Sequence, residues 1–111
     1  MYSLQELLSS MVEKGASDLH ITAGSAPVFR INGDLKRMEG EPLTATDTRA
    51  LCYSILNESQ KKRFEEEWEL DLSFGIKNVS RYRANVFMQR GAVAAAFRII
   101  PYEIRTLAEL N

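Results

Sequence analysis

Three arginines in one short segment carry the clearest chemical signal in this sequence. Residues 80–98 alternate like two strands joined at Arg90-Gly91. Side chains two residues apart share one face of a strand, so Arg81 and Arg83 are predicted to point the same way. If Arg90-Gly91 forms a two-residue turn, Arg98 lies opposite Arg83. The spacing therefore predicts three guanidinium groups on one face of a hairpin.

Three arginines on one face allow two interpretations, and the residues alone leave both open. Like charges that face each other weaken a strand pair, whereas an arginine fork binds phosphate in a bidentate manner. Alanines share the face of Arg98 and leave room for a ligand, and neither strand contains Asp or Glu. The first reading is therefore an anion site. The second is a solvated sheet face on which Arg81 and Arg83 pair with nearby carboxylates, which the helices could supply.

Composition limits the partners of this face. The chain has 111 residues and a net charge of -1, which suits one soluble domain and excludes a general binder of nucleic acid or other polyanions. Cys52 is the single cysteine and lies among apolar neighbours, so we expect an inert buried thiol in a reducing compartment. No apolar run approaches the ~18–20 residues of a membrane span or follows a cationic leader. We therefore expect a cytoplasmic protein.

The usual signatures of a self-contained enzyme are missing from these 111 residues. The sequence has no GxxxxGK[ST] loop, no GxGxxG element and no metal-ligand spacing. His20 stands beside Asp18 on the polar side of an alternating strand, which is typical of a hydrogen-bonded structural histidine. The run 65–67 of three glutamates favours a solvated helix face. The isolated chain is therefore predicted not to be an enzyme.

Local signals predict the elements that position the arginines. Ser3 and Glu6 have capping-box spacing before an apolar stripe that stops at Gly15, and Asn32-Gly33 is a strong hairpin signal. Thr44 and Asn57 are predicted to begin two further helices. The order is helix, three strands, two helices and three strands, which predicts a small α+β domain: an antiparallel sheet of about five to six strands with helices packed on one face. The predicted core includes Leu4, Leu7, Leu8, Met11, Val12, Phe64, Trp68, Leu70, Leu72, Phe74, Ile76 and Phe97.

The end of the sequence has a different character. Pro101 is expected to end the last strand because it cannot donate to a ladder. Beyond it, Ile104, Leu107 and Leu110 are spaced by three in a polar segment. This pattern predicts a short helical turn or a linker that docks on another surface, and we expect further chain after Asn111.

Five blocks of sequence resemble one protein family. Ala16-Ser17-Asp18-Leu19-His20-Ile21, followed by Phe29-Arg30-Ile31-Asn32-Gly33, resembles the ASD(I/L)H…R(I/V)(D/N)G signature of secretion-superfamily ATPases. The blocks 70–74, 80–87 and 96–101 then follow in the order typical of PilT-type twitching-motility ATPases, the motors that retract type IV pili. The resemblance covers essentially the whole chain and includes both the retraction motor and its close paralogue.

The resemblance implies a fold and a place in a larger protein. Residues 1–101 would form a PAS-like N-terminal domain, and residues 102–111 would begin a linker to a RecA-like ATPase domain that this sequence does not contain. Six full-length subunits would form a ring that binds ATP and Mg between the two domains of each subunit. The ring would work with the type IV pilus machinery at the cytoplasmic face of the inner membrane.

The resemblance also implies a role for the arginine hairpin. By motif, Arg81, Arg83 and Arg98 match arginines that reach over the nucleotide phosphates, where they act as clamps or sensors of the γ-phosphate. Two rival functions remain. One is a plain assembly domain whose arginines never meet phosphate. The other is a PAS-like sensory module with a ligand cavity lined by Leu72, Phe74, Val86 or Phe97.

Overall fold

A computed structural model of the chain describes residues 2–100. Within that range the elements are α1 Leu4–Lys14, β1 Ala16–Ile21, β2 Val28–Ile31, β3 Asp34–Arg37, α2 Ala45–Tyr53, α3 Glu58–Glu67, β4 Glu69–Ile76, β5 Ser80–Gln89 and β6 Ala92–Ile100. The element order is the one predicted from the sequence. Pro101 and the predicted linker 102–111 lie outside the described residues.

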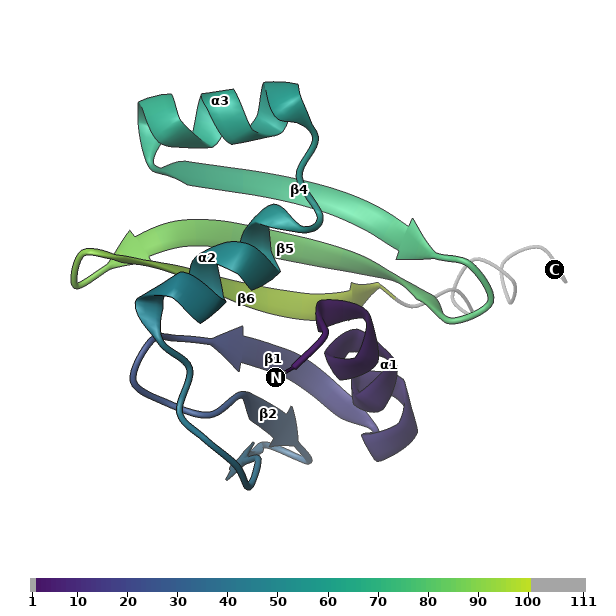
Figure 1. Cartoon of the computed structure of the whole chain (residues 1–111). Helices are drawn as coiled ribbons and strands as arrows, with labels where there is room; N and C mark the ends of the chain where they lie inside the picture. Colours follow the sequence, from purple (N-terminus) through teal and green to yellow (C-terminus); the bar gives the residue numbers. More distant parts are fainter. Residues whose placement is uncertain (1, 101–111) are drawn as a thin grey trace, which may run out of the picture.

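The strands form one six-stranded sheet in the order β3-β2-β1-β6-β5-β4. Every neighbouring pair is antiparallel, including β1 with β6, which come from opposite ends of the sequence. Helices α1 and α2 lie over one face of the sheet, and α3 runs beside β4 at its outer edge (Figure 1). The predicted α+β class is confirmed, and the arrangement is consistent with a PAS-like domain.

Turns and caps explain most element boundaries. Gly15 ends α1 with φ 69°, and Asn32 and Gly33 adopt φ 53° and 85° in the β2–β3 hairpin, as left-handed turn positions require. Thr44 and Asn57 begin α2 and α3 as predicted, and each closes a capping box, with Asp47 and Gln60 respectively. The capping box predicted for Ser3 is wrong, because Ser3 is the N-cap of α1 but its side chain makes no cap hydrogen bond.

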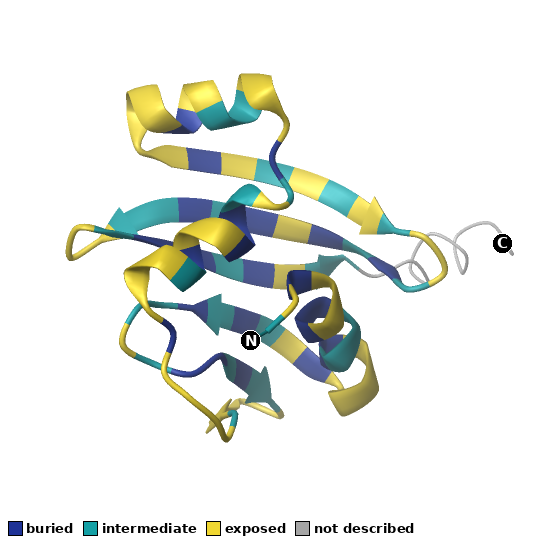
Figure 2. Ribbon diagram, in the orientation of Figure 1, coloured by how far each residue is buried: buried dark blue, intermediate teal, exposed yellow. Residues whose placement is uncertain are grey.

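The core lies between the sheet and the two covering helices. Burial alternates along β5, so every second residue faces the helices (Figure 2). Tyr82 is fully buried there, and its hydroxyl donates a 2.7 Å hydrogen bond to the carbonyl oxygen of Leu8 in α1. Cys52 is also fully buried, and desolvation raises the pKa of its thiol to about 12. The predicted burial of the Cys52 thiol is confirmed, and a raised pKa disfavours the reactive thiolate.

Two predicted core residues are exposed instead. Val12 is 45% exposed because it lies at the margin of the buried stripe of α1, one position beyond Met11. Trp68 is 51% exposed because α3 ends there: it is the C-cap residue, with φ 60°, and leaves the helical periodicity. Its ring keeps an edge-on contact with the buried Phe64, with the centroids 5.7 Å apart.

Candidate functional site

The hairpin register that the arginine argument required is present. Arg83 pairs directly with Arg98 across β5 and β6. Arg90 and Gly91 form the two-residue turn with φ 54° and 79°, both in the left-handed region. Arg81, Arg83 and Arg98 therefore share one face of the sheet. We call it the open face, because α1 and α2 cover the opposite side.

Strand pairing extends this face into a row that crosses the whole sheet. Arg83 and Arg98 are flanked by β4 on one side and by β1, β2 and β3 on the other. We call these paired residues the arginine row: Ser73, Arg83, Arg98, Asp18, Arg30 and Leu35. The next row on the same face contains Asp71, Asn85, Ala96, His20, Val28 and Arg37. The row therefore holds three arginines around one carboxylate.

Asp18 holds two of these arginines. Arg98 Nε donates a 3.0 Å hydrogen bond to Asp18 Oδ1, and Arg30 Nε lies 3.6 Å from Oδ2. The side chain of Asp18 is only 14% exposed, whereas that of Arg98 is 73% exposed. The carboxylate thus fixes one end of the Arg98 side chain and partly neutralises it, which reduces its repulsion of Arg83.

The electrostatics of Asp18 reflect competing effects. Burial raises the pKa of the Asp18 carboxyl, but hydrogen bonds from Ser17 and Arg98 and the positive charge of Arg98 together lower it by more. The Ser17 hydroxyl donates at 2.8 Å. The net result is a pKa below the ordinary value of 3.8. Asp18 is therefore ionised at neutral pH and contributes a fixed negative charge to the arginine row.

This pKa shift predicts an acid-sensitive contribution to stability. Because folding lowers the pKa of Asp18, the ion pair stabilises the domain above pH ~4, and the stabilisation is lost as the pH falls through the folded-state pKa. Since Arg98 is well exposed, we expect Asp18→Asn to lower the free energy of unfolding by about 0.5–1 kcal/mol at pH 7. Urea unfolding of both proteins at pH 7 and pH 3 measures this difference. A difference of the same size at both pH values would contradict the ionic origin.

Arg83 and Arg81 have no ion-pair partner among residues 2–100. Arg83 is exposed, whereas Arg81 is half-buried and lies across Gly75 of β4. A side chain at Gly75 would approach Arg81 Nη1 within 3.2 Å, so the glycine gives the guanidinium space to lie along the sheet. Arg83 is therefore the arginine of the row that is best placed to meet an outside anion.

Small and polar side chains surround the arginines. Ala94 and Ala96 precede Arg98 on the open face of β6, as predicted, but Ala94 is buried, so only Ala96 leaves room beside Arg98. Asn85 donates a 3.0 Å hydrogen bond to Asp71. His20 lies beside Ala96 on this face, and it makes no hydrogen bond within the described part of the chain. Its predicted structural hydrogen bond is therefore not seen there.

Residues 2–100 offer no other obvious chemistry. They contain no group of three or more His, Cys, Asp or Glu side chains that could hold a metal ion. In the same range, no helix combines the length and apolarity needed to span a membrane. The arginine row is therefore the candidate site.

The site contains one arginine that the sequence reasoning did not place. Arg30 joins the row because β2 pairs with β1 and brings it beside Asp18. Its Nη1 also donates to the carbonyl oxygen of Gly33 at 3.1 Å. Two features of the sequence could have indicated the position of Arg30. The alternation of Asp18 and His20 marks the polar face of β1, and the Asn32-Gly33 turn fixes which residues of β2 share a face.

Comparison with known proteins identifies the relatives of this domain. No protein-family model matches the chain. The type IV pilus retraction ATPase PilT of Pseudomonas aeruginosa is 43% identical over 108 residues, which cover 97% of this chain and 31% of that protein. PilU, a type IV pilus ATPase of the same organism, is 38% identical over 96% of this chain and 28% of its own length. A twitching motility protein of Neisseria gonorrhoeae is 34% identical over 99% of this chain and 29% of its length.

Solved structures agree with the sequence comparison. A crystal structure of the pilus retraction motor PilT with bound ADP matches with a TM-score of 0.84 and 45% identity, over 91% of this chain and 30% of that one. The ATPase DotB of Legionella pneumophila matches with a TM-score of 0.69 at 24% identity, over 88% of this chain and 27% of that chain, and shows the fold alone. This chain spans about a third of the length of these relatives. By sequence and by fold, the chain belongs to the PilT-type ATPases of type IV pilus systems and corresponds to their N-terminal domain.

Proposed function

We propose that this domain supplies arginines to the phosphates of ATP held by a RecA-like domain in the full-length protein. Arg83 would make the main contact, with Arg98 and Arg81 beside it. An arginine that meets the γ-phosphate stabilises the charge that develops during phosphoryl transfer. The domain would thereby couple the state of the nucleotide to the position of the arginine row.

The observation that carries this proposal is the pairing of Arg83 with Arg98 on a helix-free sheet face. Arg83 is exposed and has no ion-pair partner among residues 2–100, whereas Asp18 orients Arg98. The small side chain of the half-buried Ala96 beside Arg98 allows a bulky group to approach the row. A preoriented arginine beside an uncommitted one suits a phosphate that carries several charged oxygens.

The remaining parts of the nucleotide site would come from outside this chain. The 111 residues lack a phosphate-binding loop, so the isolated domain is expected neither to bind ATP tightly nor to hydrolyse it. ATP and Mg would be held by the RecA-like domain, reached through a linker that begins at residues 102–111. The bound ADP in the solved PilT structure supports nucleotide chemistry for the full-length relative.

The wider setting follows from the same family. The full-length protein would be a hexameric motor ATPase for pilus retraction and twitching motility. It would be cytoplasmic and act at the cytoplasmic face of the inner membrane, with the pilus machinery as its partner. Subunit packing would place this domain against the RecA-like domains of its own chain and of a neighbouring subunit.

A pure assembly domain is the second candidate, and one contact favours it. Arg98 already has a carboxylate partner in Asp18, so the row could equally form salt bridges between subunits. The sensory module is disfavoured. Val86 and Phe97 are fully buried in the core, and the groove of about 660 Å³ between α1, α2 and β4 touches only Phe74 of the four residues proposed to line a ligand cavity.

Nucleotide binding by the full-length protein separates the two candidates. We expect Arg83→Ala to weaken binding of a non-hydrolysable ATP analogue by about 10- to 100-fold, since a hydrogen bond to a charged group contributes about 1.5–3 kcal/mol. Binding of ADP should weaken less because it lacks the γ-phosphate. Fluorescence titration gives both affinities, and light scattering after size-exclusion chromatography gives the ring assembly.

A matched substitution on the same hairpin controls for loss of charge. Arg90→Asn removes an arginine from the turn and retains an Asn-Gly pair that suits the left-handed backbone. It should leave both affinities unchanged. The domain serves assembly only if Arg83→Ala reduces the fraction of protein in rings, while the rings that still form bind the ATP analogue with normal affinity.

A further inference from the structure

Exposed apolar side chains mark the two opposite edges of the sheet. Leu35 in β3 is 58% exposed, and Trp68 next to β4 is 51% exposed. β3 and β4 are the first and last strands in the sheet order. Five inter-strand spacings separate them, or roughly 24 Å. The two side chains therefore cannot cover each other within one molecule.

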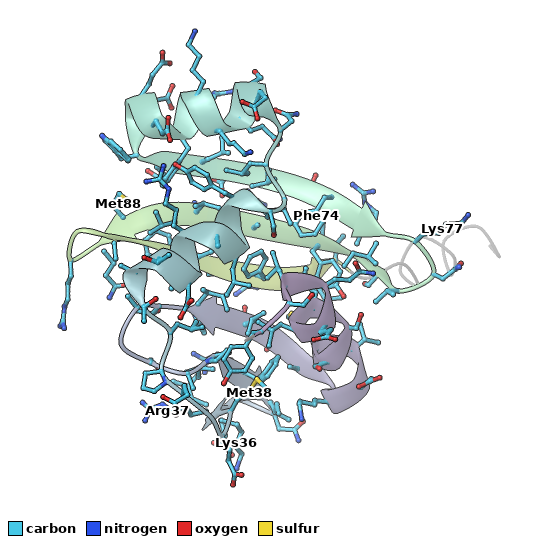
Figure 3. All side chains as sticks on the ribbon, in the orientation of Figure 1. Lys36, Arg37, Met38, Phe74, Lys77 and Met88 are labelled. Carbon is cyan, nitrogen blue, oxygen red and sulfur yellow. The ribbon has the colours of Figure 1, made fainter. Side chains whose placement is uncertain are left out.

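The β3 edge is basic. We use this name for Leu35, Lys36 and Arg37, and all four residues of β3 are exposed. Lys36 and Arg37 have no ion-pair partner among residues 2–100. Figure 3 shows both side chains at the end of the molecule far from α3. Asp34, next to the turn, is the one acidic residue of this strand.

The α3 edge is acidic and strained. We use this name for Glu66, Glu67, Trp68 and Glu69, all of which are exposed. Glu67 faces Arg63 at 3.8 Å, whereas Glu66 and Glu69 have no ion-pair partner within the described range. Trp68 adopts φ 60°, where glycine or asparagine would fit at lower energy. An exposed tryptophan kept in a strained conformation is typical of a residue that a partner buries.

We propose that the β3 edge of one copy of this domain docks on the α3 edge of the next copy. Leu35 would pack against Trp68, while Lys36 and Arg37 face Glu66 and Glu69. The charges of the two edges are complementary, and each edge contains one exposed apolar residue. Since the two edges lie at opposite ends of the sheet, each contact leaves one edge free on either copy.

Such a contact is heterologous, so it builds a ring or an open chain of domains rather than a closed dimer. The inference rests on the β3 edge and the α3 edge and does not need the arginine row to meet phosphate. Its test uses the 111-residue chain alone and contains no nucleotide. Failure of this contact and failure of the proposed phosphate role are therefore distinguishable.

Charge reversal at each edge tests the contact. Sedimentation velocity of the chain at up to ~1 mM should detect self-association that weakens with added salt. Lys36→Glu with Arg37→Glu should reduce the association constant at least tenfold, and so should Glu66→Lys with Glu69→Lys. An equimolar mixture of the two double variants should restore association, because every acidic edge then meets a basic one.

Two further variants keep this test specific. Trp68→Asn suits the left-handed backbone and should weaken association without unfolding the domain. Glu6→Lys with Glu13→Lys on the exposed side of α1 matches the charge change of the α3-edge variant and should leave association unchanged. A chain that stays monomeric at ~1 mM, a closed dimer, or a mixture that fails to restore association would each overturn the proposal.

Discussion

Replacing Arg83 by alanine in the full-length protein is expected to lower the ATP turnover rate by about 100- to 1000-fold. Arg83 is exposed on the open face and has no ion-pair partner among residues 2–100. In the proposed phosphate contact, its full charge would therefore be available to the transferring phosphoryl group. The loss should appear in kcat, because the developing charge of the transition state exceeds that of bound ATP.

Arg98→Ala should reduce turnover less, by roughly tenfold. Its Nε is already held by Asp18 at 3.0 Å, so part of its charge is neutralised before any phosphate arrives. Steady-state ATPase assays of Arg83→Ala, Arg98→Ala and the Arg90→Asn control give this ranking. If Arg83→Ala and Arg98→Ala form intact rings and hydrolyse ATP at the same normal rate as Arg90→Asn, a phosphate contact by the arginine row is excluded.

Local turn chemistry made the hairpin predictable from sequence. Arg90 and Gly91 must both adopt positive φ in a two-residue turn, and that turn alone sets the pairing of Arg83 with Arg98. The Asn32-Gly33 turn set the β2–β3 pairing for the same reason. A register fixed by a two-residue loop needs no information from elsewhere in the chain.

The partner of Arg98 could not be predicted in the same way. Asp18 and Arg98 are 80 residues apart and meet only because β1 pairs with β6. No local pattern encodes which edge of the C-terminal hairpin receives β1. Helices were the expected source of a balancing carboxylate, but Asp18 lies in a strand, β1.

The burial predicted for Trp68 was wrong for a different reason. Its spacing of four from Phe64 predicted a shared buried face, which requires the helix to continue through both residues. α3 ends at Glu67, and the left-handed conformation of Trp68 turns the chain into β4. A helix boundary that lies one residue earlier than expected moved the tryptophan from the core to the surface.

Phe97→Ala is expected to lower the free energy of unfolding by about 3–5 kcal/mol. Phe97 is fully buried on the core face of β6, where it pairs with Leu19 of β1 and Ala84 of β5. Truncation would leave a cavity at the point where the two ends of the sequence meet. This loss is a large share of the ~5–15 kcal/mol that stabilises a typical domain, and urea unfolding at pH 7 measures it.

The neighbouring residue supplies the matched control. Arg98 follows Phe97 in β6 and points to the open face, so Arg98→Ala should cost only about 0.5–1 kcal/mol through loss of its ion pair with Asp18. Adjacent residues of a strand point to opposite faces of the sheet, so Phe97→Ala should cost far more stability than Arg98→Ala. A shift of the strand register by one residue would exchange the two faces. Equal losses for the two variants would place Arg98 in the core and remove it from the arginine row.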